Sequence, residues 1–303
     1  MRPKFLGPLL AAIALWPGTA DAAESAGRGA YLFAAAGCAN CHTDKAGKGA
    51  PLAGGRRLKT PFGDFYSPNI TPDPEHGIGR WSEDDFQRAL RDGVAPDGSH
   101  YFPVFPYASF TLMTDRDIRD LRAYIFSLGP RATPNKPHRV DPPFGWRFLV
   151  PFWKWLYFTP GPFTPDPGRN SRWNRGAYLV RALGHCGECH TPRGWLGGPR
   201  DGMDMAGTGQ GPQGGSIPNI TPDAETGIGR WSDSDYHSLL KMGMTPDGDF
   251  VDGAMGEVVE NTTSRLNESD LQAMIHYLKS LPAVGNRVEK EEKDEKGEKE
   301  PWE

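Results

Sequence analysis

The sequence predicts an all-α fold built from two similar domains in tandem. The first observation is an internal repeat, because NITPDPEHGIGRWS at 69–82 returns as NITPDAETGIGRWS at 219–232. The second is that both halves end in an amphipathic helix pattern, at 113–128 and 266–281. The third is that no segment alternates apolar and polar residues over the length of a useful strand.

The first segment, residues 1–22, resembles a secretory signal. Arg2 and Lys4 give it a positive start, an apolar stretch runs from Phe5 to Trp16, and Ala20-Asp21-Ala22 offers a small-x-small cleavage site. The apolar run is too short to span a bilayer. We therefore expect cleavage and a periplasmic protein. The alternative is an uncleaved anchor, and an association with the inner membrane is left open.

The repeat extends beyond the quoted loop and divides the mature chain into domains at 23–132 and 171–285. GRGAYLFAAAGCANCHT at 27–43 resembles NRGAYLVRALGHCGECHT at 174–191, with one extra residue, His185, in the second copy. Two domains of this size are ordinary for a chain of 303 residues.

Helix signals occur at matching places in the two halves. Gly29 and Gly176, in the first helices, are small enough to let another helix approach closely, with Tyr124 and Tyr277 as candidate partners on the last helices. Capping-box patterns of Ser, Thr or Asn followed three residues later by Asp open four predicted helices. They lie at Ser82–Asp85, Thr114–Asp117, Ser232–Asp235 and Asn267–Asp270.

All four cysteines lie in two C-x-x-C-H motifs. Cys38, Cys41 and His42 form CANCH, and Cys186, Cys189 and His190 form CGECH. This is the attachment pattern for c-type haem, in which two thiols on one helical turn bind the vinyl groups and the histidine ligates the iron. We therefore expect two covalently bound haem c groups, with His42 and His190 as proximal ligands.

Other uses of the cysteines explain the pattern less well. A zinc site needs paired knuckles much closer in sequence than these. A disulfide framework suits an exported protein but gives no reason for a histidine after each pair. A thioredoxin-like motif needs a β-α-β context, which the sequence does not show.

These features together carry a resemblance to a known family. Each half resembles a class I cytochrome c domain. The whole body, about residues 25–285, is similar to the multi-haem c-type subunits of periplasmic alcohol or gluconate dehydrogenases. The segments that carry the resemblance are AYLVRALGHCGECHTPRG, the two repeated loops, FPYASFTLMTDRDI and MGEVVENTTSRLNESDL. The resemblance implies an electron-transfer subunit, with no catalytic residues of its own. Its partners would be a periplasmic dehydrogenase and a downstream cytochrome, quinone or oxidase.

A methionine opposite the histidine is the usual sixth ligand of such a haem. Met113 is the only methionine between Met1 and Met203, so we assign it to the first haem, with His100 as the competitor. In the second half there are six methionines, and the resemblance implies Met255. A packing role is the alternative for each, since that is the commoner use of methionine.

The repeated loop contains side chains suited to the polar edge of a haem. Asparagine and tryptophan can donate hydrogen bonds, and arginine can bind a propionate. The alternative is a turn and helix start with no haem contact. The residues predicted to contact the haem are Asn69, Arg80 and Trp81 in the first copy and Asn219, Arg230 and Trp231 in the second.

Residues 133–170 form a linker rich in proline and aromatic residues, with nine aromatics from Phe144 to Phe163. Packing between the domains is the first reading, docking on a dehydrogenase the second, and a membrane interface beside Arg147 and Lys154 the third. The tail, 286–303, is dominated by charge and is predicted to be disordered. A docking segment ending in Trp302 is the alternative.

Charge excludes nucleic acid as a partner. The net charge of the chain is −4, and no basic field is present. A di-haem redox enzyme, of the peroxidase or thiosulfate dehydrogenase type, is the alternative function. A peroxidase needs an open iron position, and a thiosulfate enzyme often uses a cysteine ligand. The methionines and the absence of a spare cysteine favour electron transfer.

Overall fold

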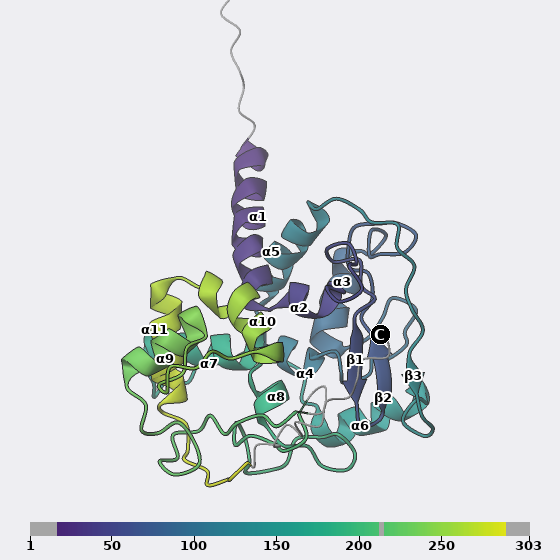
Figure 1. The fold of residues 1–303 in the computed structure, drawn as a ribbon. Coiled ribbons are helices and arrows are strands. Elements are labelled where there is room, and N and C mark those ends of the chain that lie inside the picture. Colours follow the sequence, from purple (N-terminus) through teal and green to yellow (C-terminus); the bar gives the residue numbers. More distant parts are fainter. Residues whose placement is uncertain (1–16, 212–214, 289–303) are drawn as a thin grey trace, which may run out of the picture.

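The computed structural model describes residues 17–211 and 215–288, so most of the predicted signal (1–16) and tail (289–303) lie outside the described residues (Figure 1). The first half contains α1 (Pro17–Ala35), α2 (Cys38–His42), β1 (Arg57–Thr60), β2 (Gly63–Tyr66), α3 (Glu83–Asp92), α4 (Tyr107–Phe110) and α5 (Asp115–Phe126). The connecting segment contains β3 (Arg139–Val140), η1 (Arg147–Leu149) and α6 (Val150–Tyr157). The second half contains α7 (Ser171–Tyr178), η2 (Leu179–Leu183), α8 (Gly187–His190), α9 (Asp233–Met242), α10 (Gly253–Asn261), η4 (Thr263–Arg265) and α11 (Glu268–Leu278).

The same helix crossing organises each half. α1 packs on α5, and α7 packs on α11 (Figure 1). A Cβ atom added to Gly29 would lie 2.0 Å from the carbonyl oxygen of Asp120, and one added to Gly176 would lie 2.0 Å from that of Ala273. The next contacts would be Tyr124 and Tyr277. The predicted close approach is confirmed, with the predicted tyrosines.

The extra residue of the second half is absorbed in its first helix. α7 continues directly into η2, a short π-helix, and His185 follows with a φ of 39°. A π-helix accommodates one more residue than an α-helix over the same rise. The attachment motif therefore reaches an equivalent position in both halves despite the insertion.

A small sheet corrects the expectation of a purely helical fold. β1 pairs with β2, and β2 with β3, all antiparallel, with Leu58 opposite Phe65. Phe65 packs beneath the sheet against Phe102 and Val150. The strands are short, and the alternation in RLKT and GDFY covers only four residues each, which is why the pattern was missed. The fold is mostly α.

Two of the four predicted capping boxes form in full, at Ser82–Asp85 and Ser232–Asp235. At the last helices only the N-cap bond forms, from Thr114 and Asn267. The carboxylates of Asp117 and Asp270 instead accept hydrogen bonds from the other half.

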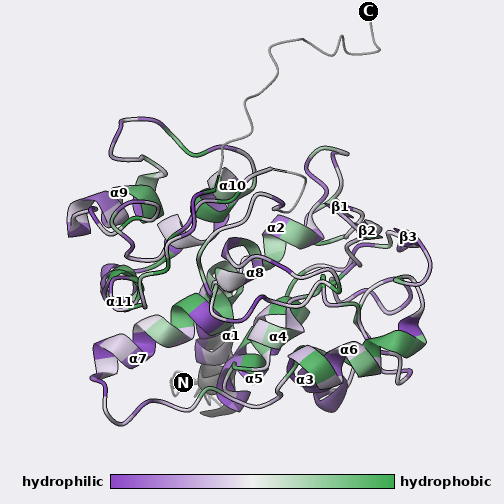
Figure 2. Ribbon diagram, turned by 90° about the horizontal axis from the view of Figure 1, so that it is seen from below, coloured by the Kyte–Doolittle hydropathy of each residue, from purple (hydrophilic) through white to green (hydrophobic). Residues whose placement is uncertain are grey.

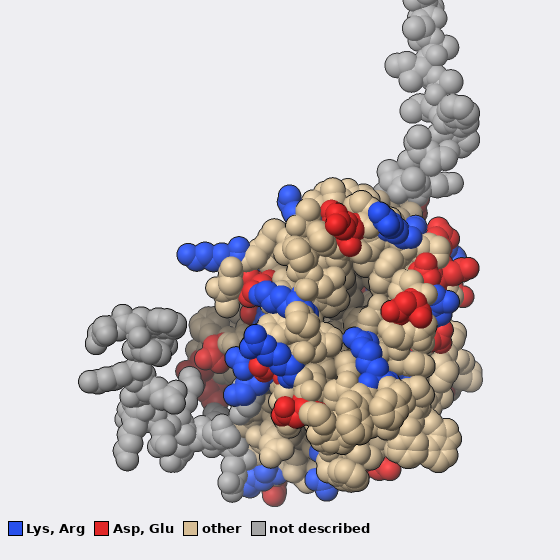
Figure 3. Space-filling model, turned by 90° about the vertical axis from the view of Figure 1, so that its right-hand side faces the viewer, with Lys and Arg blue, Asp and Glu red and all other residues tan. Residues whose placement is uncertain are grey.

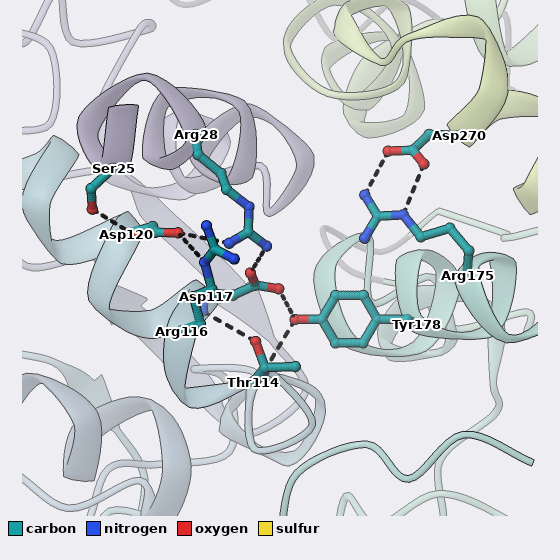
Figure 4. A network of polar contacts seen from close by, with 9 residues as sticks. All are labelled: Ser25, Arg28, Thr114, Arg116, Asp117, Asp120, Arg175, Tyr178 and Asp270. Atoms are coloured by element: carbon teal, nitrogen blue, oxygen red, sulfur yellow. Dashed lines mark hydrogen bonds and ion pairs between the residues drawn. The ribbon is translucent and has the colours of Figure 1, made fainter. Parts of the chain in front are cut away.

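Matching tyrosine–aspartate contacts join the two halves. Tyr31 of α1 donates its hydroxyl hydrogen to Asp270 of α11 at 2.6 Å. Tyr178, its counterpart in the repeat, donates to Asp117 of α5 at 2.5 Å (Figure 4). Each hydroxyl also accepts a hydrogen bond from the N–H of the N-cap residue of the helix it reaches. The interface is therefore reciprocal, with each half holding the first turn of the other's last helix.

Each aspartate also binds an arginine of its own half. Arg175 holds Asp270 through two N···O contacts of 2.8 and 2.6 Å, and Arg28 binds both Asp117 and Asp120 (Figure 4). The aspartate side chains are almost fully buried. The charge is thus balanced within one half, and the tyrosine of the other half adds a neutral donor.

Acid is expected to weaken this interface. Burial alone would raise the pKa of Asp270, but the hydrogen bonds from Arg175 and Tyr31 outweigh it and hold the pKa below its usual range. A carboxyl with a depressed native pKa stabilises the fold above its unfolded pKa of about 3.9 and loses that contribution as the pH falls through the native value. We expect urea unfolding to show a loss of stability below pH ~4 that shrinks in Asp270→Asn. An equal loss in the variant would contradict this assignment.

The connecting segment is ordered and divides into two sets of aromatic residues. One set packs between the halves: Trp153, Tyr157, Phe158 and Phe163 contact Leu196, Gly198, Tyr107 and Tyr178 respectively. The other set is exposed on η1 and α6, where Figure 2 shows green hydrophobic residues interrupted by pale and purple ones. The start of the segment belongs to the first half, since β3 completes its sheet.

Order also extends past the predicted end of the second domain. Asn286 donates from its side chain to the carbonyl of Ala206 at 2.8 Å and from its backbone to Thr226. Across the described residues, no helix is long and apolar enough to cross a membrane.

Candidate functional site: two haem-attachment motifs

The two attachment histidines are oriented in the same way. The ring Nδ1 of His42 lies 2.7 Å from the carbonyl oxygen of Pro68, and that of His190 lies 2.8 Å from the carbonyl oxygen of Pro218. A carbonyl can only accept, so Nδ1 carries the hydrogen and Nε2 presents its lone pair. The two prolines precede the repeated loops. The proline before each loop therefore sets the tautomer of the histidine.

The state of these groups fits a covalently bound haem. Burial lowers the pKa of both His42 and His190, which keeps the imidazoles neutral, the form that binds a metal. All four cysteine thiols are free, with no disulfide between them. Neither Nε2 atom has a hydrogen-bond partner among the described residues. Each motif thus offers two thiols and one neutral imidazole from a single turn.

The side chains of the asparagines at the start of the two loops are hydrogen-bonded within the protein. The side-chain N–H groups of Asn69 donate to the carbonyls of Arg131 and Thr133, and those of Asn219 donate to Thr226 and Val284. Both amide hydrogens of each asparagine therefore already have acceptors. These side chains tie the loop to the segment after the last helix. Neither asparagine therefore has a spare amide hydrogen to donate to a haem propionate. The propionate contact of each one stays a prediction.

The glycines of the loop allow close approach within the loop itself. A Cβ atom added to Gly77 would lie 2.2 Å from the Thr71 carbonyl oxygen, and one added to Gly227 would lie 2.3 Å from that of Thr221. Neither glycine has a positive φ, so it is the close approach that requires glycine at these positions. The loop is compact and packs against itself. This agrees with the alternative in which the loop is a turn followed by a helix start.

The remaining loop residues are placed differently. Trp81 and Trp231 are partly buried and pack against the hydrophobic core. Arg80 and Arg230 are exposed, and no hydrogen bond or ion pair engages either within the described residues. Both arginines are thus free to bind a carboxylate, and their haem contact stays a prediction.

Two residues are candidates for the sixth ligand of the first haem iron, and they lie in different surroundings. Met113 is fully buried in the core that also contains Leu32 and Ala35 and against which Cys38 packs. His100 lies under α6, where its Nδ1 is 2.9 Å from the Nζ of Lys154. Burial and the Lys154 charge lower the pKa of His100. Its hydrogen-bonded place outside the core favours Met113.

The repeat shows that the two ligand segments differ in path. Met113 stands directly before the N-cap of α5, and Leu266 stands directly before the N-cap of α11. Both are buried, so a core residue is needed there in each half. Met255 lies earlier, near the start of α10, and is partly buried. Both iron–methionine bonds stay predictions.

Two methionines of the second half, Met205 and Met274, correspond to leucines in the first half. Met205 and Leu52 share a left-handed backbone, with φ of 59° and 61°, and each N–H donates at 3.1 Å to the threonine after an attachment histidine. Met274 corresponds to Leu121 in the buried face of the last helix. Since leucine serves in the first half, packing accounts for both methionines.

Met255→Ala is expected to open the second haem to carbon monoxide, because loss of the thioether leaves an iron position free. The weak sulfur-to-iron absorption band of the oxidised protein should fall as well. Met205→Leu is the matched control and should change neither. Carbon monoxide binding spectra of the reduced proteins provide the measurement. A Met255→Ala protein that binds no carbon monoxide would assign the ligand to another residue.

The two attachment motifs lie beside one another at the interface of the halves. Asn40, within CANCH, accepts a hydrogen bond from Asn261 of α10 at 2.8 Å, and Glu188, within CGECH, accepts one from Ser109 of α4 at 2.8 Å. The pKa of Cys189 is raised to about 11. Burial is the largest cause, the charge of Glu188 is the second, and the nearby Cys41 of the other motif is the third. Each motif thus contacts the other half.

Comparison with known proteins agrees with this site. A model of the cytochrome c family matches residues 26–129 and again residues 174–282, one match for each attachment motif. The chain belongs to the cytochrome c family. With two such domains it is a di-haem cytochrome, carrying one covalently bound haem c in each half.

Its relatives are cytochromes and cytochrome subunits. It is 43% identical over 268 residues to the diheme cytochrome c-type protein of Cereibacter sphaeroides, covering 86% of both chains. It is 41% identical to the cytochrome c subunit of an alcohol dehydrogenase (quinone) from Gluconacetobacter polyoxogenes, covering 90% of this chain and 61% of the other. It is 38% identical to the gluconate 2-dehydrogenase cytochrome c subunit of Pantoea cypripedii, covering 84% and 59%. This di-haem cytochrome thus spans about three fifths of the dehydrogenase subunits.

Pro68 and Pro218 are functional residues of this cytochrome that the sequence reasoning missed. The identity between the repeats begins at these prolines, one position before the quoted loop. That one-residue extension was the available signal. Its meaning depended on the distance to the histidine ring, which only the fold supplies.

Proposed function

We propose that this di-haem cytochrome carries electrons in the periplasm from a dehydrogenase to a downstream respiratory acceptor, which is another cytochrome, a quinone or an oxidase. A haem c accepts and releases one electron at its iron, and the protein sets its ligands and burial. The observation that carries the proposal is that both attachment motifs lie at one interface, in contact with each other's half.

The residues of the chain support a carrier. Pro68 and Pro218 hold the ring of each attachment histidine, so neither ligand has to reorient. The reciprocal contacts of Tyr31 and Tyr178 hold the halves in one relative position. A fixed geometry suits electron exchange, since little reorganisation is needed at the moment of transfer.

The relatives named as dehydrogenase subunits support a dehydrogenase as donor. The predicted signal at 1–22 supports a periplasmic location, and the exposed aromatic residues of α6 support a peripheral contact with the inner membrane.

Isolation of the complex tests this proposal. The cytochrome is purified under mild conditions from its native cells, and the partner's cofactor and substrate are identified. We expect a dehydrogenase whose substrate reduces the bound haems. A cytochrome that purifies alone and turns over peroxide or thiosulfate would overturn the proposal in favour of a redox enzyme.

A further inference from the structure

The helix α10 carries the predicted sixth ligand of the second haem and is too short to be stable alone. Met255 is its third residue, and Gly256 in its middle lowers the helix propensity further. Val258, one turn after Met255, lines a cavity together with Cys186 of the second attachment motif. Residues three apart share one side of a helix, so Met255 and Val258 both face the second attachment motif. Contacts from outside α10 must hold this side in place.

Another side of α10 is bound by the first half of the chain. Asn261 donates a hydrogen bond to the side chain of Asn40 at 2.8 Å, and Asn40 donates to the hydroxyl of Thr262, directly after the helix, at 3.3 Å. The guanidinium of Arg56 donates to the carboxylate of Glu257 and to the backbone carbonyl of Asn40, each at 2.5 Å. α10 accordingly lies beside α2 (Figure 1). The half that attaches the first haem therefore holds the helix that carries the predicted ligand of the second.

The same kind of contact occurs in the opposite direction. Glu188 has the place in CGECH that Asn40 has in CANCH, and it accepts a hydrogen bond from Ser109 of α4 at 2.8 Å. Ser109 and Thr262 occupy the same place relative to the N-cap of the last helix of their half. α4 leads directly to Met113, the predicted ligand of the first haem. Each attachment motif thus contacts the ligand segment of the other half.

We propose that Asn40 and Arg56 of the first half position α10 and so keep Met255 on the iron of the second haem. Both act through the helix, so they are positioning residues and not ligands. The side chains of Arg56 and Glu257 are 16 and 28% exposed, and solvent therefore screens their attraction less than that of a surface pair. The inference rests on Met255 as the ligand. It makes the ligation of one haem depend on the half that attaches the other.

Carbon monoxide binding by the reduced holo-protein tests the proposal. Arg56→Met should raise the bound fraction at least ~10-fold over the wild type, because a loosened α10 releases Met255 from the iron. Arg56→Lys keeps a positive charge and should restore part of the wild-type behaviour. Glu257→Ala removes the partner in the second half and should match Arg56→Met, although alanine is the better helix former. Because the two substitutions lie in different halves, their agreement guards against a folding defect in one of them.

Lys45→Met is the matched control. Lys45 also pairs with α10, since its Nζ lies 2.9 Å from a carboxylate oxygen of Glu260, but the two side chains are 46 and 65% exposed. Charged side chains of both signs also occur over the face of the molecule drawn in Figure 3, and exposed pairs contribute little. Lys45→Met should therefore bind carbon monoxide like the wild type. Equal binding by Lys45→Met and Arg56→Met would overturn the proposal, because any loss of charge beside α10 would then suffice.

Combining Arg56→Met with Met255→Ala identifies the haem on which Arg56 acts. Since Met255→Ala already opens the second iron, the combined variant should bind one carbon monoxide for each chain, as Met255→Ala does alone. Two for each chain would place the effect of Arg56 on the first haem and overturn the proposal. The proposal also fails if Arg56→Met or Met255→Ala binds no carbon monoxide. Because no dehydrogenase takes part, failure here is separate from failure of the electron-transfer role.

Discussion

Gly29→Ala should destabilise the protein, whereas Gly27→Ala, two residues earlier on the same helix, should stabilise it. At Gly29 the new methyl group would lie 2.0 Å from the Asp120 carbonyl oxygen and 2.8 Å from the Cβ of Tyr124. α1 and α5 must then separate, at a cost of about 3 kcal/mol typical of an overpacked contact. At Gly27 nothing lies within 4 Å, so alanine should add about 0.5–1 kcal/mol through helix propensity.

Denaturant unfolding of the two holo-proteins measures both effects. The opposite signs exclude helix propensity as the cause, since both positions lie in α1 and receive the same substitution. Equal effects of the two substitutions would mean that the helix crossing does not depend on Gly29. Gly176→Ala should reproduce the loss in the second half, because its Cβ would meet Ala273 at the same distance.

Asp117→Ala is expected to cost about 3 kcal/mol, since it removes a buried carboxylate, leaves the Tyr178 hydroxyl without an acceptor and leaves Arg28 with Asp120 as its remaining partner. The side chain of Asp117 is 2% exposed, and it binds Arg28 and the hydroxyl of Tyr178. The hydroxyl is buried, so no water replaces the lost bond freely. Because Tyr178 comes from the other half, the interface between the halves should weaken together with the first domain.

Asp115→Ala is the control on the same helix. The Asp115 side chain is 58% exposed and pairs with Arg91, so its removal should cost less than about 1 kcal/mol. Thermal unfolding followed by haem absorbance compares the two variants. Comparable losses at Asp115 and Asp117 would show that the reciprocal tyrosine contact adds little. Tyr178→Phe, which keeps the ring, should cost about 1 kcal/mol from the hydrogen bond alone.

Local signals in the sequence predicted the parts of the fold that depend on neighbouring residues. Ser82 and Ser232 cap their helices as expected, and Gly29 and Gly176 lie where two helices cross. These features need only a short pattern and a general rule. The attachment motifs belong to the same kind, since their spacing alone specifies the group they bind.

Apart from the helix crossings, features that depend on distant partners were not predicted. Asp117 could close a capping box or bind a tyrosine 61 residues away, and only the packed structure selects the second. The third strand of the sheet forms because Val140, from the connecting segment, pairs with Gly63. The aromatic residues of 144–163 divide between the interior and the surface because Lys154 fixes how α6 is turned.

Single-turnover reduction tests the central claim most directly, namely that the chain takes electrons from a dehydrogenase and shares them between its two haems. The oxidised cytochrome is mixed with the co-purified dehydrogenase and its substrate, and haem absorbance is followed with time. The predicted result is reduction of both haems, two electrons for each chain. Substrate turnover that leaves the haems oxidised, or reduces only one of them, would contradict the account.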